Sequence, residues 1–281
     1  MSLTGAGASA RRGAGPAKFR LWVEVKRYSE ALRSLGITLV SIGGFLLAWQ
    51  ILSTHFLNPL FIPPPTAVVS AALPMIASGE ILRDIAISMT RVIVGFVTGS
   101  LSAVVLGVLL GRIRLLHDIC DPIVELLRFL SPTAMIPIAV IWFGIGEMSK
   151  YFLIFWGTFF IVLVNTVAGV WGAPIIRQRA AQCLGANKLQ IFLLIIVPSA
   201  APYIVTGMRV AMASSFMSII PAEILAANSG IGYLLQKSSM LLQTDRIFVA
   251  LITICLLGFL TDRAFRLITN KLLARYMAPA A

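Results

Sequence analysis

Long apolar segments separated by short polar loops run through most of the chain. A transmembrane helix needs about 20 mostly apolar residues. Six stretches meet that need: about 37–54, 86–111, 122–145, 151–172, 199–222 and 247–268. The pattern predicts an all-α membrane protein with about six transmembrane helices in one domain over residues 37–270, followed by a short cytoplasmic tail over 271–281.

Residues 1–36 carry a different pattern. Seven Lys and Arg side chains precede any adequate apolar run, which is unlike a cleaved signal peptide. Apolar residues such as Phe19, Trp22, Val25 and Leu32 recur at roughly helical spacing, with basic residues mostly between them. This favours an amphipathic helix that lies at the membrane interface.

Composition and charge agree with a membrane protein and indicate its orientation. Of the 281 residues, 58% are hydrophobic and 12% are charged, far from the roughly 25% charged residues of a soluble domain. Of the 23 Lys and Arg, sixteen fall in loops and terminal segments on one side of the predicted spans and five on the other. Because cytoplasmic loops carry the excess of basic residues, both termini are predicted to lie in the cytoplasm.

Motifs for catalysis, metal binding and nucleotide binding are missing from the sequence. Cys120, Cys183 and Cys255 lie far apart without a CxxC pair, and the two histidines lie in separate loops. The sequence has no Gly-Lys pair for a Walker A loop, no Gly-x-Ser-x-Gly and no His-Glu-x-x-His. We therefore expect no enzyme activity, metal or cofactor in this chain.

The segment 177–198 is cytoplasmic by charge, yet rich in small and apolar residues. Ala180, Ala181 and Leu184 can share one face of a short helix, and Gly185 interrupts that helix. From the residues alone, the segment is either an ordinary loop between two helices or an element that packs against a partner.

The spacing within this segment resembles a known motif. Two alanines, a glycine four residues after the second, and a proline thirteen residues further match the EAA motif in the membrane subunits of binding-protein-dependent ABC importers. The family usually has Glu at the position of Arg179. The resemblance therefore implies docking on the ATPase, but without the acidic contact that this Glu would make. The residues expected to dock on a cytoplasmic ABC ATPase are Arg179, Ala180, Ala181, Leu184, Gly185 and Ala186.

The resemblance covers nearly all of residues 37–270 and looks like the nitrate/sulfonate/taurine branch of these permeases. Its other parts are Phe61–Pro65, Arg91–Phe96, Pro132–Pro137, Trp142–Lys150, Asn165–Thr166, and Ala222–Glu223 with Ser229–Gly232. It implies the type I importer fold, with two copies of this permease, an ATPase dimer that binds ATP and Mg²⁺, and an external or periplasmic solute-binding protein.

The same resemblance implies a location and a cargo. The location is the bacterial plasma (inner) membrane, and the cargo is a small anion or organic acid of the sulfonate, taurine, nitrate, bicarbonate or carboxylate type. The alternatives are an ABC importer for a vitamin precursor, and a self-contained secondary transporter or channel.

Small residues recur along the second predicted span. Gly95, Gly99, Ala103, Gly107 and Gly111 are spaced by four and put a ridge of small side chains on one helix face. Such a ridge lets another backbone approach closely in lipid. Static helix packing is the favoured interpretation, and a sliding surface during transport is the alternative.

The fifth predicted span is the candidate for lining the translocation path, through Arg209, Ala211, Ser215 and Ser218. A charge within an apolar stretch is costly unless it pairs, snorkels or meets water. Arg209 is therefore predicted either to face a water-filled path that attracts an anion, or to pair with a buried acid or with backbone carbonyls near the Pro198 break.

Two further groups of polar residues are candidates for specific roles. Glu125 and Arg128 lie three residues apart on one helical face, which predicts a local ion pair. Glu223 lies at the outer end of the fifth span, followed by Ser229 and Gly230. This group is predicted to anchor the following loop, or to form an external gate or a contact with the binding protein.

Overall fold

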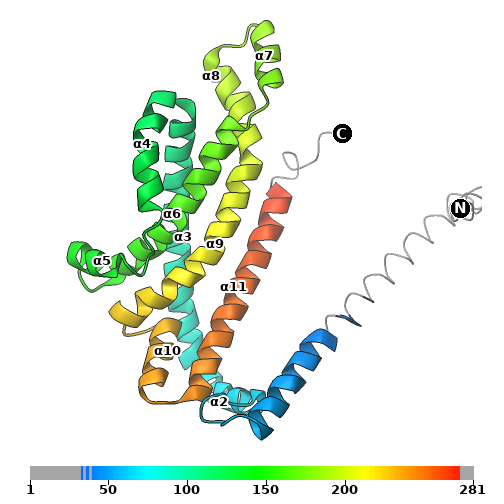
Figure 1. The fold of residues 1–281 in the computed structure, drawn as a ribbon, viewed down its shortest axis with the longest axis vertical. Coiled ribbons are helices and arrows are strands. Elements are labelled where there is room, and N and C mark those ends of the chain that lie inside the picture. Colours follow the sequence, from blue (N-terminus) through cyan, green and yellow to red (C-terminus); the bar gives the residue numbers. More distant parts are fainter. Residues whose placement is uncertain (1–32, 34–35, 38–39, 273–281) are drawn as a thin grey trace, which may run out of the picture. The chain divides into compact units, whose positions relative to one another are not determined.

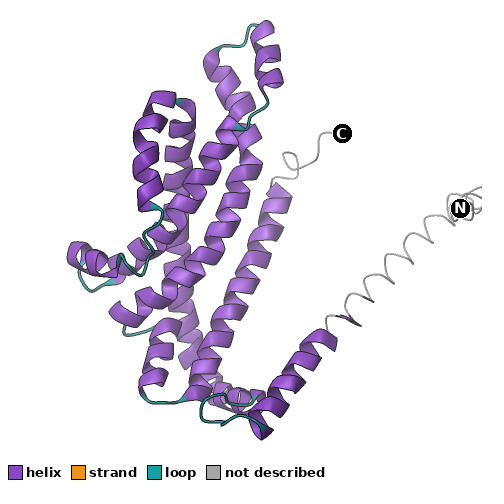
Figure 2. Ribbon diagram, in the orientation of Figure 1, coloured by secondary structure: helices purple, strands orange, loops and turns teal. Residues whose placement is uncertain are grey.

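A computed structural model describes residues 33, 36–37 and 40–272, and all regular structure among these residues is helical (Figures 1 and 2). The chain divides into two compact units, one ending at Thr66 and one comprising residues 67–281. The predicted interfacial helix over 1–36 lies almost wholly outside the described residues, as does most of the predicted tail.

The first unit contains a helix over residues 40–55, which coincides with most of the first predicted span. A proline-rich segment without helix follows it and folds back along it. The Ser53 hydroxyl donates a hydrogen bond to the Ile62 carbonyl oxygen, and the Gln50 amide donates to the Thr66 hydroxyl at 3.3 Å. Prolines lack the N–H that a helix needs, so the chain stays extended here.

The second unit consists of helices of very different lengths. A π-helical turn, η2 (Phe192–Ile196), joins α8 to α9, so the chain stays helical from Lys188 through the whole of α9. The α-helices are α2 (Pro65–Ala77), α3 (Glu80–Arg112), α4 (Arg114–Leu127), α5 (Ile136–Phe143), α6 (Glu147–Trp171), α7 (Ile175–Cys183), α8 (Lys188–Ile191), α9 (Val197–Ala226), α10 (Ile231–Met240) and α11 (Thr244–Leu272).

Among the described residues, four helical stretches are long and apolar enough to cross a membrane: Glu80–Arg112, Glu147–Trp171, Lys188–Ile224 and Thr244–Lys271. They correspond to the second, fourth, fifth and sixth predicted spans. The second, fourth and sixth begin several residues before the predicted limits, and the fifth begins about ten residues before them.

The prediction of a continuous third span over 122–145 is wrong. Helix α4 ends at Leu127, and α5 begins only at Ile136 and has 8 residues, too few to cross a bilayer. Pro132 in the intervening turn has no N–H to donate and disfavours helical backbone before it. The indole of Trp156 donates a hydrogen bond to the Leu130 carbonyl oxygen at 3.0 Å, which satisfies part of the turn.

Helix α6 lies between α3 and α9 and makes its main helix contacts with both (Figure 1). Its α3 side packs on the predicted ridge of small residues. A Cβ built on Gly95 would lie 2.6 Å from the Cβ of Ile154, and one built on Gly107 would lie 2.7 Å from the Cβ of Thr166. The two backbones are therefore too close for any larger side chain, which confirms the close helix approach predicted for the ridge.

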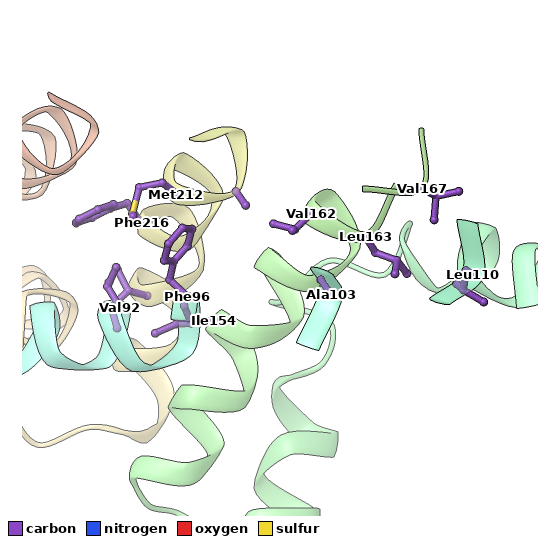
Figure 3. Close-up of a cluster of buried hydrophobic side chains, with 12 residues drawn as sticks. Val92, Phe96, Ala103, Leu110, Ile154, Val162, Leu163, Val167, Met212 and Phe216 are labelled. Carbon is purple, nitrogen blue, oxygen red and sulfur yellow. The ribbon is translucent and has the colours of Figure 1, made fainter. Parts of the chain in front are cut away.

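Apolar side chains close the space between these helices (Figure 3). Val92 and Phe96 of α3, Leu163 of α6, and Met212 and Phe216 of α9 belong to one buried cluster. This core fixes the three helices relative to one another and places their ends, where the polar residues gather.

We expect Gly95→Ala to destabilise the permease, because the added methyl group would overlap Ile154. Overpacking of a tight contact costs roughly 1–3 kcal/mol, which should lower the midpoint of thermal unfolding in detergent. The matched control is Gly43→Ala in the helix over 40–55, where an added Cβ meets nothing within 4 Å. Equal midpoints for both variants would contradict the tight α3–α6 contact.

Candidate functional site

The predicted docking residues lie together on a short helix–turn–helix at one end of the second unit (Figure 1). Helix α7 ends at Cys183, and Gly185 reverses the chain with φ +84°, a backbone conformation that L side chains rarely adopt. The next turn is a capping box. The Gln190 N–H donates to Asn187 Oδ1 at 2.8 Å, and the Asn187 N–H donates to Gln190 Oε1 at 2.9 Å.

Most of this helix–turn–helix is exposed, although Ile191 at the end of α8 is buried. None of the residues of α7 is buried, and Leu184 directly after it is 88% exposed. Ile176 near the start of α7 is 78% exposed. Large apolar side chains presented on a rigid turn are typical of a protein contact surface, which agrees with the docking role that the EAA resemblance implies.

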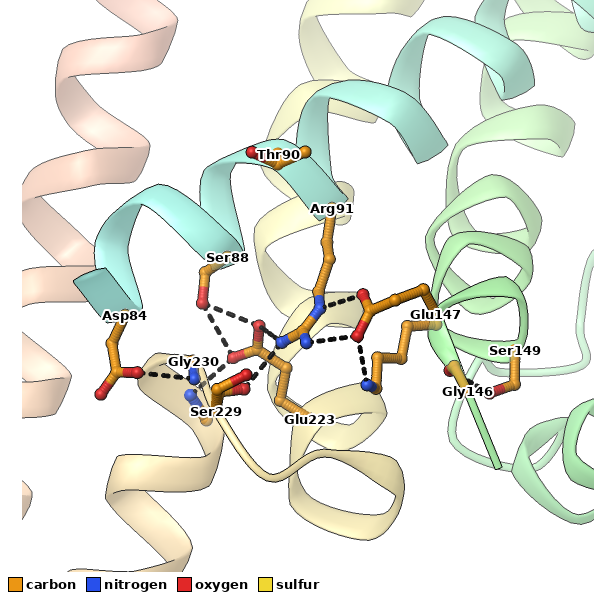
Figure 4. A network of polar contacts seen from close by, with 12 residues as sticks. Asp84, Ser88, Thr90, Arg91, Gly146, Glu147, Ser149, Glu223, Ser229 and Gly230 are labelled. Atoms are coloured by element: carbon orange, nitrogen blue, oxygen red, sulfur yellow. Dashed lines mark hydrogen bonds and ion pairs between the residues drawn. The ribbon is translucent and has the colours of Figure 1, made fainter. Parts of the chain in front are cut away.

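An ionic network, buried except at Glu147, joins α3, α6 and α9 on the side away from the α7–α8 turn (Figure 4). The guanidinium of Arg91 in α3 donates two hydrogen bonds of 2.6 Å to the carboxylate of Glu147 in α6. It donates a third of 2.7 Å to Glu223 in α9 and a fourth of 2.7 Å to the Ser229 carbonyl oxygen. Arg91 is 2% exposed and Glu223 is fully buried. We call Arg91, Glu147, Lys150 and Glu223 the ionic network.

The remaining bonds of the network tie down the loop after α9. Glu223 accepts hydrogen bonds from the Ser88 hydroxyl at 2.7 Å and from the Gly232 N–H at 2.8 Å. The Gly230 N–H donates to Asp84 Oδ1 at 2.9 Å. Gly230 has φ +110°, and an added Cβ would collide with the Glu223 carboxylate, so only glycine fits there. The predicted anchoring of this loop by Glu223 is confirmed.

Sequence reasoning missed the partners of Glu223. In the sequence, Arg91 stood out only as part of a family motif within the second predicted span. In the structure it is almost completely buried and paired with acids of α6 and α9. Glu147 and Lys150 were recognised only as part of a family motif, and their ion pair of 2.7 Å was not predicted. A usable signal existed, because two opposite charges in or beside apolar spans are expected to pair.

Arg209 lies on α9 and pairs with an acid on α11. Its Nε lies 3.0 Å from Asp262 Oδ1, and Arg266 of α11 lies 2.9 Å from the other oxygen of the same carboxylate. The Arg209 side chain is 47% exposed. Of the predicted alternatives, pairing with an acid is the contact observed, although the acid is not deeply buried.

Ala211, Ser215 and Ser218 do not lie on a free face of α9. All three are buried, and the Ser215 hydroxyl lies 3.0 Å from the hydroxyl of Thr158 in α6. In this conformation the three side chains face the interior of the helix packing, so their role in lining the translocation path stays a prediction. Their small size serves the α6–α9 contact, as the ridge of α3 serves the contact on the other side of α6.

Two other predictions concern surface charge and metal binding. The Glu125–Arg128 pair is confirmed, with a distance of 3.3 Å.

Within the described part of the chain, no three His, Cys, Asp or Glu side chains are grouped so that they could hold a metal ion.

Comparison with known proteins identifies the family. The model for the binding-protein-dependent transport system inner membrane component matches residues 103–273, which is more than half of the chain. This chain belongs to that family. It is therefore an inner-membrane, multi-pass permease of an ABC transporter and is not catalytic itself. Systems of this kind include an ATPase and a binding protein, and membership in the family decides against a self-contained secondary transporter or channel.

The similar proteins include permeases of known or assigned cargo. A putative ABC transporter permease of Methanocaldococcus jannaschii is 36% identical, covering 80% of this chain and 86% of the relative. The putative aliphatic sulfonates transport permease of Escherichia coli is 35% identical over 80% and 86% of the two chains. The taurine transport system permease of Escherichia coli is 33% identical over 80% and 83%.

We expect Arg91→Met to reduce the amount and thermal stability of the folded permease strongly. It would leave Glu223 buried without its cation, and breaking a buried pair costs about 3–5 kcal/mol. The matched control is Arg83→Met, which removes an exposed arginine from the same helix. Glu147→Gln should cost less than Arg91→Met, because the Glu147 side chain is 49% exposed. An Arg91→Met protein as stable as the Arg83→Met protein would contradict a structural role for the network.

Proposed function

We propose that this chain is the membrane subunit of an ATP-driven importer that moves a small anion, of which a sulfonate is the best-supported class, into the cytoplasm. The observation that carries the proposal is the exposed helix–turn–helix of α7 and α8 within a member of this permease family. The sulfonate class is supported by the names of the taurine and aliphatic sulfonates relatives. The class of cargo can be tested by measuring, in parallel, how fast the assembled importer takes up sulfonates, nitrate and a vitamin precursor.

In this proposal α7 and the turn at Gly185 dock on a cytoplasmic ATPase. Two permease copies are needed, because one chain offers one such turn and two ATPase subunits act together. ATP and Mg²⁺ bind to the ATPase and not to this chain. Arg179 lies on the exposed helix α7 where the family usually has Glu, so we expect it to meet an acidic or neutral part of the ATPase.

The proposed topology has both termini in the cytoplasm and residues 37–270 as the membrane domain. It is supported by four basic residues at helix ends on the α7–α8 side (Figure 1): Arg112 ends α3, Arg114 begins α4, Lys188 begins α8 and Lys271 lies in the last turn of α11. The helix over 40–55 and the broken α4–α5 segment complete the six membrane elements of the type I importer fold.

The proposed external end is the one that carries the ionic network. Ser229, in the loop after α9, borders a cavity of about 410 Å³ there, whose wall also includes Arg83, Asp84 and Lys237. We propose that this end meets the solute-binding protein and that Glu223 holds the contact loop in place from beneath.

We expect Gly185→Val to lower transport and substrate-stimulated ATP hydrolysis, while the protein still inserts and purifies as two permease copies. A β-branched residue in left-handed backbone costs roughly 1–2 kcal/mol, and it adds volume at the docking surface. The matched control is Gly79→Val. Gly79 also has a positive φ, of +76°, and an added Cβ there meets nothing within 4 Å, but Gly79 precedes α3 and lies far from the α7–α8 turn. The measurement is the amount of ATPase that copurifies. Retention of the ATPase by Gly185→Val to the same extent as by Gly79→Val would show that the turn is not the docking site.

We expect Arg209→Met to impair uptake per folded complex more than Arg209→Lys does, because a fixed positive charge would attract an anionic cargo. Arg266→Met is the matched control, since Arg266 contacts the same Asp262 from within α11. The exchange Arg209→Asp with Asp262→Arg tests the alternative that Arg209 only clamps α9 to α11. Restored stability without restored uptake supports the pathway role, and full recovery of both would contradict it.

A further inference from the structure

A strongly basic cavity lies beside the α7–α8 turn. It has a volume of about 680 Å³, and its wall includes Arg112 and Arg114, which flank the turn between α3 and α4, together with Lys188 at the start of α8. All three side chains are exposed. Among the described residues, no carboxylate lies within 4.0 Å of any of the three cations, whereas Arg91 of α3, Arg128 directly after α4 and Arg209 of α9 each have such a partner. The cavity therefore has an unbalanced positive charge.

Its geometry is held by contacts that are independent of any ligand. The Arg112 guanidinium lies 4.6 Å from the centre of the Phe192 ring, a cation–π contact that orients it. Helix α4 begins at Arg114 without a side-chain cap, so the N–H groups of its first turn add to the positive potential. These features favour an anion with oxygen acceptors, such as a phosphate group.

A second cavity, mostly apolar, lies next to the basic one. It has a volume of about 240 Å³, and Val124 of α4 and Leu163, Val164 and Val167 of α6 line it. Trp171 at the end of α6 lines both cavities, and its indole N–H donates to the Gly111 carbonyl oxygen at 3.1 Å. One carboxylate, Asp121, also borders the apolar cavity; it is half-exposed, and its oxygen lies 3.5 Å from His117 Nε2.

The two cavities lie where a membrane protein meets the lipid headgroups. The apolar spans α3 and α6 end at Arg112 and Trp171, and Trp is enriched at the membrane–water interface. The apolar cavity lies one to two turns further into the span of α6 than the basic cavity. A molecule that fills both must carry an anionic head and a hydrocarbon chain. A free phosphate would fill only the basic cavity, and a docked ATPase would leave the apolar cavity empty.

We propose that this pair of cavities binds one anionic phospholipid, with its phosphate between Arg112, Arg114 and Lys188 and an acyl chain against α4 and α6. The site needs only that the chain is a membrane protein, and it does not depend on the proposed cargo. It would link the lipid composition of the membrane to the α3–α4 turn and the start of α8, next to the turn that we propose to dock on the ATPase.

The test uses the complete complex with its ATPase, purified in detergent and analysed by native mass spectrometry after addition of phosphatidylglycerol or phosphatidylcholine. The wild-type complex should retain more phosphatidylglycerol than phosphatidylcholine. Arg114→Gln with Lys188→Gln should reduce that retention by about 5–25-fold, taking each basic side chain near an anionic surface as worth about fivefold. The matched control is Arg263→Gln with Lys271→Gln, which removes one exposed Arg and one exposed Lys from α11 and should leave retention unchanged.

A second variant separates a lipid from a soluble anion. Ala168 lines the apolar cavity but not the basic one, so Ala168→Phe should fill the space for the acyl chain while all three cations remain. It should lower retention of phosphatidylglycerol and leave any binding of inorganic phosphate unchanged.

Three results would overturn the proposal. The first is equal retention of the two lipids by the wild type. The second is a loss of retention in the α11 control as large as in the double variant at the cavity. The third is loss of the ATPase from the double variant with lipid retention unchanged, which would make the basic cavity an ATPase contact.

Discussion

The close approach of α3 and α9 to the two sides of α6 is the constraint on which the rest of the structure depends. Lipid is as apolar as Leu, so helices in a membrane gain little from burying apolar surface and associate through close packing and hydrogen bonds. On one side α6 meets the glycines of α3, and on the other its Thr158 meets Ser215 of α9. A larger side chain at either contact would separate the helices, and the ends of α3, α6 and α9 would no longer meet.

The ionic network is possible only because of that packing. Its three central residues come from three helices. Glu147 and Glu223 lie 56 and 132 residues after Arg91 in the sequence, yet their carboxylate oxygens lie 2.6 Å and 2.7 Å from its guanidinium nitrogens. Burying charges costs more than their attraction returns unless every group has its partners. Here the guanidinium, both carboxylates and the Lys150 ammonium are all hydrogen-bonded. The network therefore fixes how the helix ends away from the α7–α8 turn are arranged, and it makes the loop after α9 part of the same unit.

The sequence was sufficient for features that depend on local pattern and insufficient for those that depend on pairing. Apolar length identified the four long spans, and glycine spacing identified the packing face of α3 but not its partner α6, because length and spacing can each be read along one helix. Composition could not show that Pro132 divides an apolar stretch into α4 and α5, since the segment is apolar on both sides of the break. Asp262 was overlooked as the partner of Arg209, because nothing in either helix indicates which faces of α9 and α11 meet.

The charge balance of the network bears on where a cargo could pass. Two cations, Arg91 and Lys150, meet two carboxylates, Glu147 and Glu223, so the set is neutral and its hydrogen bonds are used internally. A neutral network, whose half-exposed member Glu147 is an anion, offers no surplus charge to attract an anion. At Asp262, in contrast, Arg209 and Arg266 share a single carboxylate, and both arginine side chains are more than a third exposed. Arg209 and Arg266 therefore leave a surplus positive charge along α9 and α11, away from the network, and an anionic cargo of the proposed kind would be attracted to it within the span.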